Sequence, residues 1–139
     1  GLQVPDTDVA SGRLNLVGYR QVAGQITREF GPTIVAITLR ESVSASDNGW
    51  SAVLWDAETG AFHHSQRYDV RLVDRIGGGD SFAAGLIYGL ITGRPPEAAL
   101  RFAVAASALK QTIPGDFNRV SVAEVDTLAG GDASGRVQR

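Results

Sequence analysis

The first regular pattern in the chain is a repeat of apolar residues every four positions, at Val22, Ile26 and Phe30. A spacing of four matches the turn of an α-helix, so residues 11–30 are predicted to form a helix with one apolar face. The Gly31–Pro32 pair that follows cannot continue a helix and therefore predicts its end.

The middle of the chain alternates apolar runs with turn residues, which is typical of β-strands. Residues 33–39 are rich in β-branched side chains and almost entirely apolar, so we expect a buried strand there. The polar residues 40–49 are expected to form a loop. Two runs on either side of residues 56–60 have the pattern of a hairpin, and the chain then continues extended toward a run of glycines. These extended segments are 50–55, 61–68 and 69–74.

The last third of the chain returns to helical patterns. We expect a largely buried helix over residues 81–93 and a second helix that begins at the Pro95–Pro96 pair, which suits a first helical turn. Ser121 and Glu124 have the spacing of a capping box and predict a short final helix. Residues 131–139 are expected to be a flexible tail.

The order of these elements mixes helices with strands that are apolar throughout, and it predicts a layered α/β fold. No repeat or linker divides the sequence, so residues 1–139 are expected to form one unit. Of its 139 residues, 43% are hydrophobic and 20% are charged, which is enough for a modest hydrophobic core.

Charge and composition exclude several functions. A formal net charge of -2 gives no electrostatic basis for binding nucleic acid or an anionic membrane, and the absence of cysteine excludes disulfides and thiolate metal sites. The longest apolar stretch, residues 82–91, is too short to span a bilayer, and no signal peptide is visible, so a cytoplasmic protein is expected. The sequence has no methionine and begins with Gly1, which favours either a processed start or a piece of a longer polypeptide.

Three consecutive glycines, Gly77 to Gly79, stand directly before Asp80 and a predicted helix. Glycine permits close approach, and the unpaired amides at a helix start carry positive partial charge, so such a turn is a typical phosphate site. The sequence lacks the P-loop pattern G-x-x-x-x-G-K-[ST], and it has Phe82 where G-x-G-x-x-G needs its third glycine.

Two interpretations of the acid after the glycines stay open. Either Asp80 or Ser81 simply caps the helix. In the other interpretation, the Asp80 carboxylate orients a hydroxyl and accepts its proton, while the glycine amides stabilise a phosphoryl group in transfer.

The segment DRIGGGDSFAAGLIYGL, residues 74–90, resembles the second signature of the ribokinase-like (PfkB) carbohydrate kinases, D-T-x-G-A-G-D-x-F. Three more segments, VAITLRESVSASDNGWSAVL, AVAASALKQTIPGDFN and GGDASGRVQR, are similar to the 2-keto-3-deoxygluconate kinases of that family. The resemblance covers the chain from about Pro5 onward. It implies a ribokinase-like α/β/α sandwich and a transfer of phosphate from ATP, with Mg²⁺, to a sugar acid, giving the 6-phosphate of 2-keto-3-deoxygluconate.

The resemblance also implies roles for single residues. Asp80 matches the family's catalytic base, and Gly77, Gly78 and Gly79 match its anion hole. Asp74 and the carbonyl of Ile76 match positions that hold a monovalent cation such as K⁺ in some members. The residues that match the ATP site are Thr38, Arg40, Ser42, Ser44, Val104, Ser107 and Ala108.

Two of these residues depart from the family's usual pattern. Arg40 stands where many members have glycine, and its guanidinium either contacts phosphate or lies at a solvent-facing strand end. Val104 stands where many members have asparagine, so its side chain can pack on adenine but cannot hydrogen-bond to it.

The largest departure is length. Family members carry an N-terminal half with most of the sugar site, a lid and an N-x-x-E motif, and here no glutamate stands three residues after Asn15, Asn48 or Asn118. The chain is therefore interpreted as the C-terminal, nucleotide-binding half, with ATP or ADP, the sugar acid and the N-terminal half as partners. A homo-oligomer is left open. The main alternative is a non-catalytic nucleotide-binding module, and a plain structural domain ranks last because it leaves the glycine run unexplained.

Overall fold

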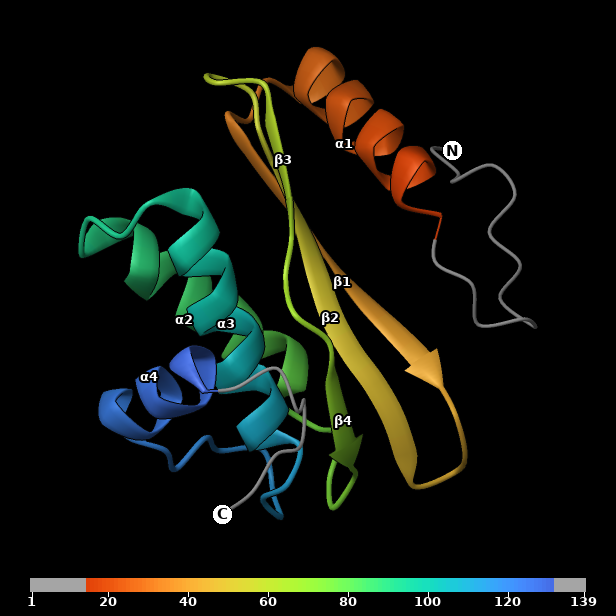
Figure 1. Ribbon diagram of the computed structural model, residues 1–139, viewed down its shortest axis with the longest axis vertical. Helices are drawn as coiled ribbons and strands as arrows, with labels where there is room; N and C mark the ends of the chain where they lie inside the picture. Colours follow the sequence, from red (N-terminus) through yellow and green to blue (C-terminus); the bar gives the residue numbers. More distant parts are fainter. Residues whose placement is uncertain (1–14, 132–139) are drawn as a thin grey trace.

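The computed structural model describes residues 15–131, and the account below is confined to them. A small sheet lies between helix α1 on one side and helices α2, α3 and α4 on the other (Figure 1). The predicted layered α/β fold is therefore confirmed. In chain order the elements are α1 (Leu16–Phe30), β1 (Ile34–Ser42), β2 (Asp47–Asp56), β3 (Ala61–His64), β4 (Tyr68–Arg71), α2 (Gly78–Ile91), α3 (Pro96–Lys110) and α4 (Val122–Gly130).

Every strand pair in the sheet is antiparallel, with the long strand β2 between β1 and the shorter strands β3 and β4. The predicted hairpin around residues 56–60 is confirmed, because β2 pairs with β3 on either side of it. The strand expected over 61–68 ends at His64, and β4 begins at Tyr68 and takes in the first part of the segment expected over 69–74. Between β3 and β4, the Ser65 hydroxyl accepts a hydrogen bond of 3.0 Å from the Ala52 amide and so takes the place of a ladder bond.

The loop predicted over residues 40–49 is correct only for residues 43–46, and both of its ends belong to strands. Strand β1 continues to Ser42, which pairs with Asn48 at the start of β2, and only a tight turn separates the two strands. The Ser44 hydroxyl donates to the Asp47 carboxylate at 2.8 Å and accepts from the Asp47 amide at 3.0 Å, which closes this turn. The side chains are polar because this end of the sheet is exposed, and strand pairing needs only the backbone.

Helix α1 ends where the sequence predicts. Gly31 has a φ of 84°, and its amide donates to the Thr27 carbonyl at 2.9 Å, which closes the helix with a left-handed residue. The predicted apolar face is only partly used, since Val22 is buried but Phe30 is 69% exposed. The first residues of the predicted helix, 11–14, lie outside the described part of the chain.

Helices α2 and α3 pack closely because glycine meets alanine at their contact. A Cβ atom on Gly89 would lie 2.8 Å from the Ala99 Cβ, and one on Gly85 would lie 3.0 Å from the Ala103 Cα. Helix α2 was predicted to be largely buried, and this holds for one face only. Its outer face leaves Ile87 and Ile91 exposed in the described structure.

Helix α3 is the centre of the core and is buried along most of its length. The capping box predicted for α4 is confirmed, because the Ser121 hydroxyl and the Glu124 carboxylate each accept a hydrogen bond from the other residue's amide. Arg94 connects α4 to the other helices through an ion pair with Asp126 at 2.6 Å and lies 4.5 Å over the Phe102 ring. The tail predicted beyond Gly131 lies outside the described residues. In residues 15–131 no helix has the length and apolar character that crossing a bilayer requires.

Candidate functional site

The glycine run forms the start of α2. Gly77 is the N-cap residue with a φ of 77°, and the helix begins at Gly78 rather than at Ser81. Asp80 therefore lies within the first helical turn, and no side chain caps the helix. The interpretation in which Asp80 or Ser81 is only a cap is wrong.

The three glycines have different surroundings. A Cβ atom on Gly77 would collide with the carbonyl oxygen of Asp116 and would lie 3.2 Å from the Lys110 Cε. The Gly78 carbonyl accepts a hydrogen bond of 2.7 Å from the buried Ser107 hydroxyl, which fixes the run from beneath. A Cβ atom on Gly79 would meet no atom within 4 Å, so this position faces open space.

The start of α2 offers backbone amides to an incoming group. The Gly78 amide donates to the Arg75 carbonyl at 3.2 Å. Within residues 15–131, no acceptor is found for the amides of Gly77, Gly79 or Asp80. These amides lie at the positive end of the helix dipole, which is the arrangement that binds phosphate groups.

The Asp80 side chain lies at the same place as these amides. It is exposed, and its carboxylate has no hydrogen bond or ion pair with any part of the chain that the structure describes. A carboxylate without a partner beside unpaired amides can accept a proton from a bound hydroxyl while the amides hold an anion.

The predicted nucleotide residues on β1 share one face of that strand. Thr38 and Arg40 lie opposite Ala52 and Trp50 of β2, and directly opposed residues in an antiparallel pair point to the same side of the sheet. Because Ala52 and Trp50 pack into the core with α3, this is the side of the sheet that faces α3. Thr38, Arg40 and Ser42 are nevertheless exposed.

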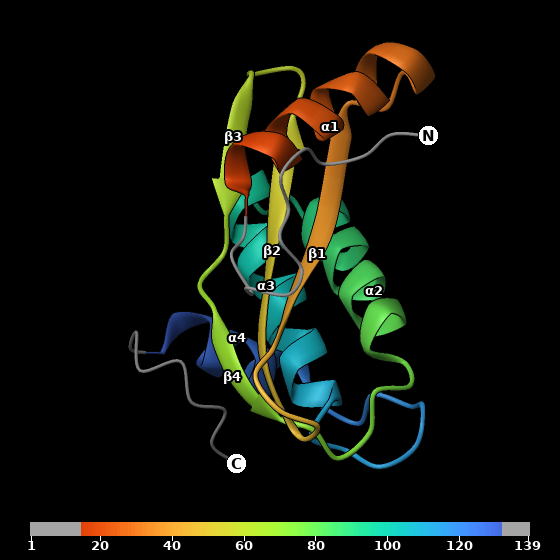
Figure 2. The same cartoon turned by 90° about the vertical axis from the view of Figure 1, so that its right-hand side faces the viewer.

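The turn after β1 lies beside the loop that leads into the glycine run. The Leu72 amide donates to the Ser46 carbonyl at 2.7 Å, and the Arg75 guanidinium donates to the Ala45 carbonyl at 3.4 Å. Figure 2 shows this turn at the same end of the molecule as the loops before α2 and after α3. The structure thus brings Ser44 and the glycine run to one end of the fold.

The three predicted nucleotide residues on α3 are differently placed. Val104, Ser107 and Ala108 are fully buried. Of the three, Ser107 bonds to the Gly78 carbonyl, and none of them offers an open surface.

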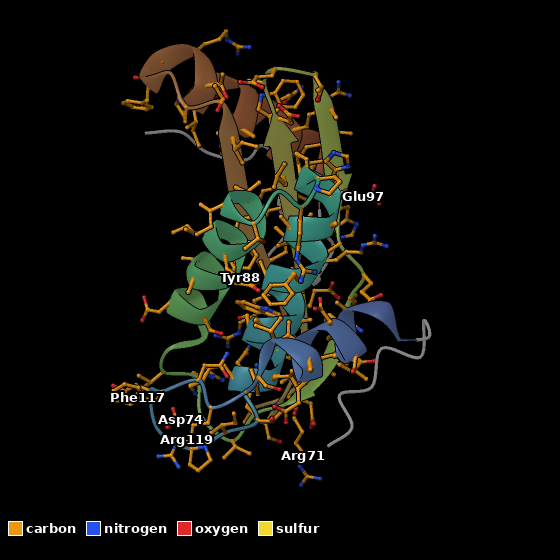
Figure 3. All side chains as sticks on the ribbon, turned by 90° about the vertical axis from the view of Figure 1, so that its left-hand side faces the viewer. Arg71, Asp74, Tyr88, Glu97, Phe117 and Arg119 are labelled. Atoms are coloured by element: carbon orange, nitrogen blue, oxygen red, sulfur yellow. The ribbon has the colours of Figure 1, made fainter. Side chains whose placement is uncertain are left out.

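Asp74 organises the loop before the glycine run. Its carboxylate oxygens accept from the Ile76 amide and from the Gly115 amide, each at 3.0 Å. These hydrogen bonds, chiefly the one from Ile76, hold the pKa of the Asp74 carboxyl below its usual value, and the positive charge of Lys110 acts in the same direction. In Figure 3, Asp74 lies at the same end of the molecule as Phe117 and Arg119 of the loop between α3 and α4.

Sequence reasoning missed three residues that build this site. The Gln111 carbonyl accepts from the Val73 and Asp74 amides at 2.9 and 3.2 Å. The Asn118 side chain donates to the Ser81 hydroxyl at 2.6 Å and so holds the loop after α3 against α2. Lys110 is fully buried beneath the glycine run. For Lys110 a signal existed, because it is the only lysine in the sequence, but its burial depends on the tertiary structure.

Two hollows in the described part of the chain lie away from the glycine run. One of about 210 Å³ lies between α2, α3 and α4 and includes Ser81 and Asn118. The other, over α1, is lined by Arg20, Gln21, Gly24, Gln25, Arg28 and Trp55. Neither is lined by Gly77 to Gly79 or Asp80. We refer to the start of α2, formed by these four residues, as the cradle.

Comparison with known proteins agrees with this geometry. Residues 25–120 match the sequence profile described as pfkB family carbohydrate kinase. The chain is 32% identical over 113 residues to the 2-dehydro-3-deoxygalactonokinase of Haloferax volcanii, a match that covers 81% of this chain and 32% of that protein.

The chain is also similar to solved structures of carbohydrate kinases. The 2-dehydro-3-deoxygluconokinase of Thermotoga maritima is 46% identical, with a TM-score of 0.79 over 83% of this chain and 35% of that one. A PfkB family carbohydrate kinase of Listeria grayi is 26% identical, with a TM-score of 0.74 over 86% of this chain and 40% of that one. The chain thus spans about a third of the length of its relatives. With a profile match over residues 25–120, which include the glycine run and β1, the chain belongs to the pfkB family of carbohydrate kinases.

Proposed function

We propose that this chain supplies the nucleotide side and the catalytic base of an ATP-dependent kinase that phosphorylates a hydroxyl of a sugar acid. The observation that carries the proposal is the open start of α2, where unpaired amides and the unpartnered Asp80 carboxylate lie together. A cradle that only bound phosphate would not need an acid beside it, because a carboxylate repels an anion.

In the proposed reaction, Asp80 accepts the proton of the sugar hydroxyl while that oxygen attacks the γ-phosphorus of ATP. The bond from the γ-phosphorus to the bridging oxygen breaks, and ADP leaves. The Gly77 and Gly79 amides donate hydrogen bonds to the oxygens of the transferring phosphoryl group, where negative charge is concentrated. The exposed row formed by Thr38, Arg40 and Ser42 is proposed to follow the nucleotide along the side of β1 that faces α3.

The proposed cofactor is ATP with Mg²⁺. The open space at Gly79 fits the close approach of a phosphate group. Among residues 15–131, no three His, Cys, Asp or Glu side chains lie together as a metal site. Mg²⁺ is therefore proposed to arrive on the nucleotide phosphates, where it neutralises their charge.

The proposed substrate is 2-keto-3-deoxygluconate, phosphorylated at its 6-hydroxyl. This choice rests on the similarity to the Thermotoga maritima 2-dehydro-3-deoxygluconokinase, which is 46% identical. The Haloferax volcanii relative is named for the galactonate epimer, so the two sugar acids need direct comparison. We propose that most contacts with the sugar come from a further segment of the kinase, because the chain covers only 35% of the Thermotoga protein.

The decisive experiment compares transfer with binding in Asp80→Asn. In a polypeptide that also supplies the N-terminal part, this variant should lower kcat by about 10²–10⁴-fold, the usual contribution of a general base, while MgADP affinity is retained. Asp126→Asn is the matched control. Asp126 lies on α4 and pairs with Arg94, so this variant should leave kcat unchanged. Both sugar acids are tested as acceptors.

Three other results would each contradict a part of the proposed function. Unchanged kcat in Asp80→Asn would remove this residue as the base. MgADP binding without transfer to either sugar acid would favour a non-catalytic nucleotide-binding module. Absence of MgADP binding in the complete polypeptide would contradict the phosphate cradle itself.

A further inference from the structure

Lys110 is the only lysine in the sequence, and it is fully buried at the end of α3. An ammonium group is costly to bury unless oxygen atoms replace its water shell. Its Nζ donates to the Ile113 carbonyl at 3.2 Å, and residues 15–131 offer it no other hydrogen bond. An ammonium has three protons to donate, so the fold by itself does not explain why a charge is kept here.

The position of Lys110 relates it to the phosphate cradle. Its Cε lies 3.2 Å from the place that a Cβ on Gly77 would take, so the side chain passes directly under the glycine run. The next residue, Gln111, accepts from the amides of Val73 and Asp74, which hold the loop before the glycines over the end of α3. The ammonium group is thus enclosed by the two loops that shape the cradle.

This is also the neighbourhood in which the family resemblance implies a monovalent cation, at Asp74 and the Ile76 carbonyl. The buried Lys110 side chain already places a positive charge beneath this loop. Both Asp74 oxygens already accept backbone amides, from Ile76 and Gly115. The Ile113 carbonyl, an oxygen of the kind that lines potassium sites, already accepts from Lys110.

We propose that the ammonium group of Lys110 is a tethered substitute for the monovalent cation, and that this kinase therefore needs no K⁺. An ammonium ion and K⁺ carry the same charge and are similar in size, so one can replace the other among carbonyl oxygens. A second cation would be repelled by Lys110 and would compete for the same carbonyl. The inference rests on the proposed function, because the charge matters to a phosphate cradle only where phosphate binds.

The first test compares two salts on the unaltered protein. Thermal unfolding and MgADP affinity are measured in potassium chloride and in tetramethylammonium chloride, whose cation is too large for a carbonyl site. The ionic strength is matched at about 0.1 M, so that long-range charge effects are screened equally. We expect the same Tm and the same Kd in both salts. A higher Tm or a tighter Kd that is specific to potassium would overturn the proposal.

The second test is a chemical rescue. Lys110→Ala removes the ammonium and leaves room for an ion. In tetramethylammonium chloride this variant should bind MgADP about tenfold more weakly, the loss expected for a charged hydrogen-bonding group. Potassium or ammonium chloride should restore most of the affinity. A loss that is equal in all salts would mean that Lys110 is only structural, and the proposal would fail.

Two control variants sharpen the rescue. Arg101→Ala removes an exposed positive charge from the same helix and should show no difference between the salts. Lys110→Met keeps an apolar stem but leaves no room for an ion, so potassium should not rescue it. Rescue of Lys110→Met to the same extent as Lys110→Ala would contradict a specific cation site.

A third measurement needs no nucleotide. Because the sequence has one lysine, ¹⁵N-lysine labelling gives a single side-chain ammonium signal. A buried, hydrogen-bonded ammonium should exchange slowly enough to be seen, and adding potassium should not shift it. A missing signal, or one that moves with potassium, would overturn the proposal. If MgADP does not bind at all, the proposed function fails, but this signal and the Tm comparison still decide the status of Lys110.

Discussion

Helix α2 contains two groups of glycines, and they differ in what surrounds them. Gly85 and Gly89 face α3, where an added Cβ would meet Ala103 or Ala99 at 3.0 Å or less. Gly79, at the start of the helix, faces no atom of the described chain within 4 Å. The protein's own packing explains Gly85 and Gly89, and it does not explain Gly79.

The two ends of this helix therefore have different purposes: the glycines at the α3 contact serve packing, and the helix start is available to a ligand. At the α3 contact, small residues allow the helices to approach, and every requirement is internal. At the helix start, amides lack acceptors, Asp80 lacks a partner, and a glycine stands where any side chain would fit. Groups left unsatisfied at an exposed position are the ones available to a ligand.

The largest effect on stability is expected for Gly77→Ala. The φ of 77° is unfavourable for alanine and costs about 1–3 kcal/mol. The new Cβ would also collide with the Asp116 carbonyl, so the loss should exceed that range. Urea unfolding measures it. Gly93→Ala is the matched control. Gly93 has a φ of 82°, and a Cβ atom added there would meet no atom within 4 Å, so this variant measures the cost of the backbone conformation alone. Equal losses in the two variants would mean that the collision relaxes freely.

A smaller loss is expected for Gly89→Ala, which tests the packing side of the comparison. The added Cβ would lie 2.8 Å from the Ala99 Cβ and 2.9 Å from its Cα, so the helices must move apart. Overpacking of this kind costs about 1–3 kcal/mol. Urea unfolding should show the loss, while MgADP affinity in the folded protein stays unchanged. A fully stable variant would show that the α2–α3 contact tolerates more separation than the structure indicates.

The converse result is expected for Gly79→Ala. Because alanine favours helix over glycine and meets no neighbour here, the free energy of unfolding should rise by up to about 1 kcal/mol. MgADP binding, measured by calorimetry, should nevertheless weaken, since the methyl group occupies the approach of phosphate. If affinity were unchanged, the third glycine would have no part in the cradle.

These contrasts also show what the sequence predicts and what it cannot. The end of α1 at Gly31 and the capping box at Ser121 were predictable, because each depends on a few neighbouring residues. The extension of β1 to Ser42 was not, because exposed polar residues pair through their backbone as well as apolar ones do. The local pattern of polar and apolar residues indicates which side chains are exposed, whereas the partner strand decides which backbone segments pair.

At the candidate site, the sequence indicated the glycine run and Asp80 through their motif. It did not indicate that α2 begins at Gly78, which excludes the capping interpretation, nor that Val104 is buried. The roles of Lys110 and Asn118 arise from contacts between distant segments. Such contacts depend on how the loop after α3 lies against α2, and no local pattern encodes that.

The smallest effect concerns the loop under the cradle and depends on pH. Because its hydrogen bonds, chiefly from the Ile76 amide, lower the pKa of Asp74 in the folded protein, the ionised carboxylate stabilises the fold. This contribution is complete above the usual aspartate pKa, about 3.9, and is lost as the pH falls through the lower folded value. Asp74→Asn should therefore be less stable than the parent near neutral pH. Urea unfolding should show that the difference in free energy of unfolding between the two proteins decreases as the pH is lowered. If this difference stayed constant as the pH was lowered, the Ile76 and Gly115 amides would not bind the charged carboxylate selectively. The support of the cradle would then rest on Gln111 and Lys110.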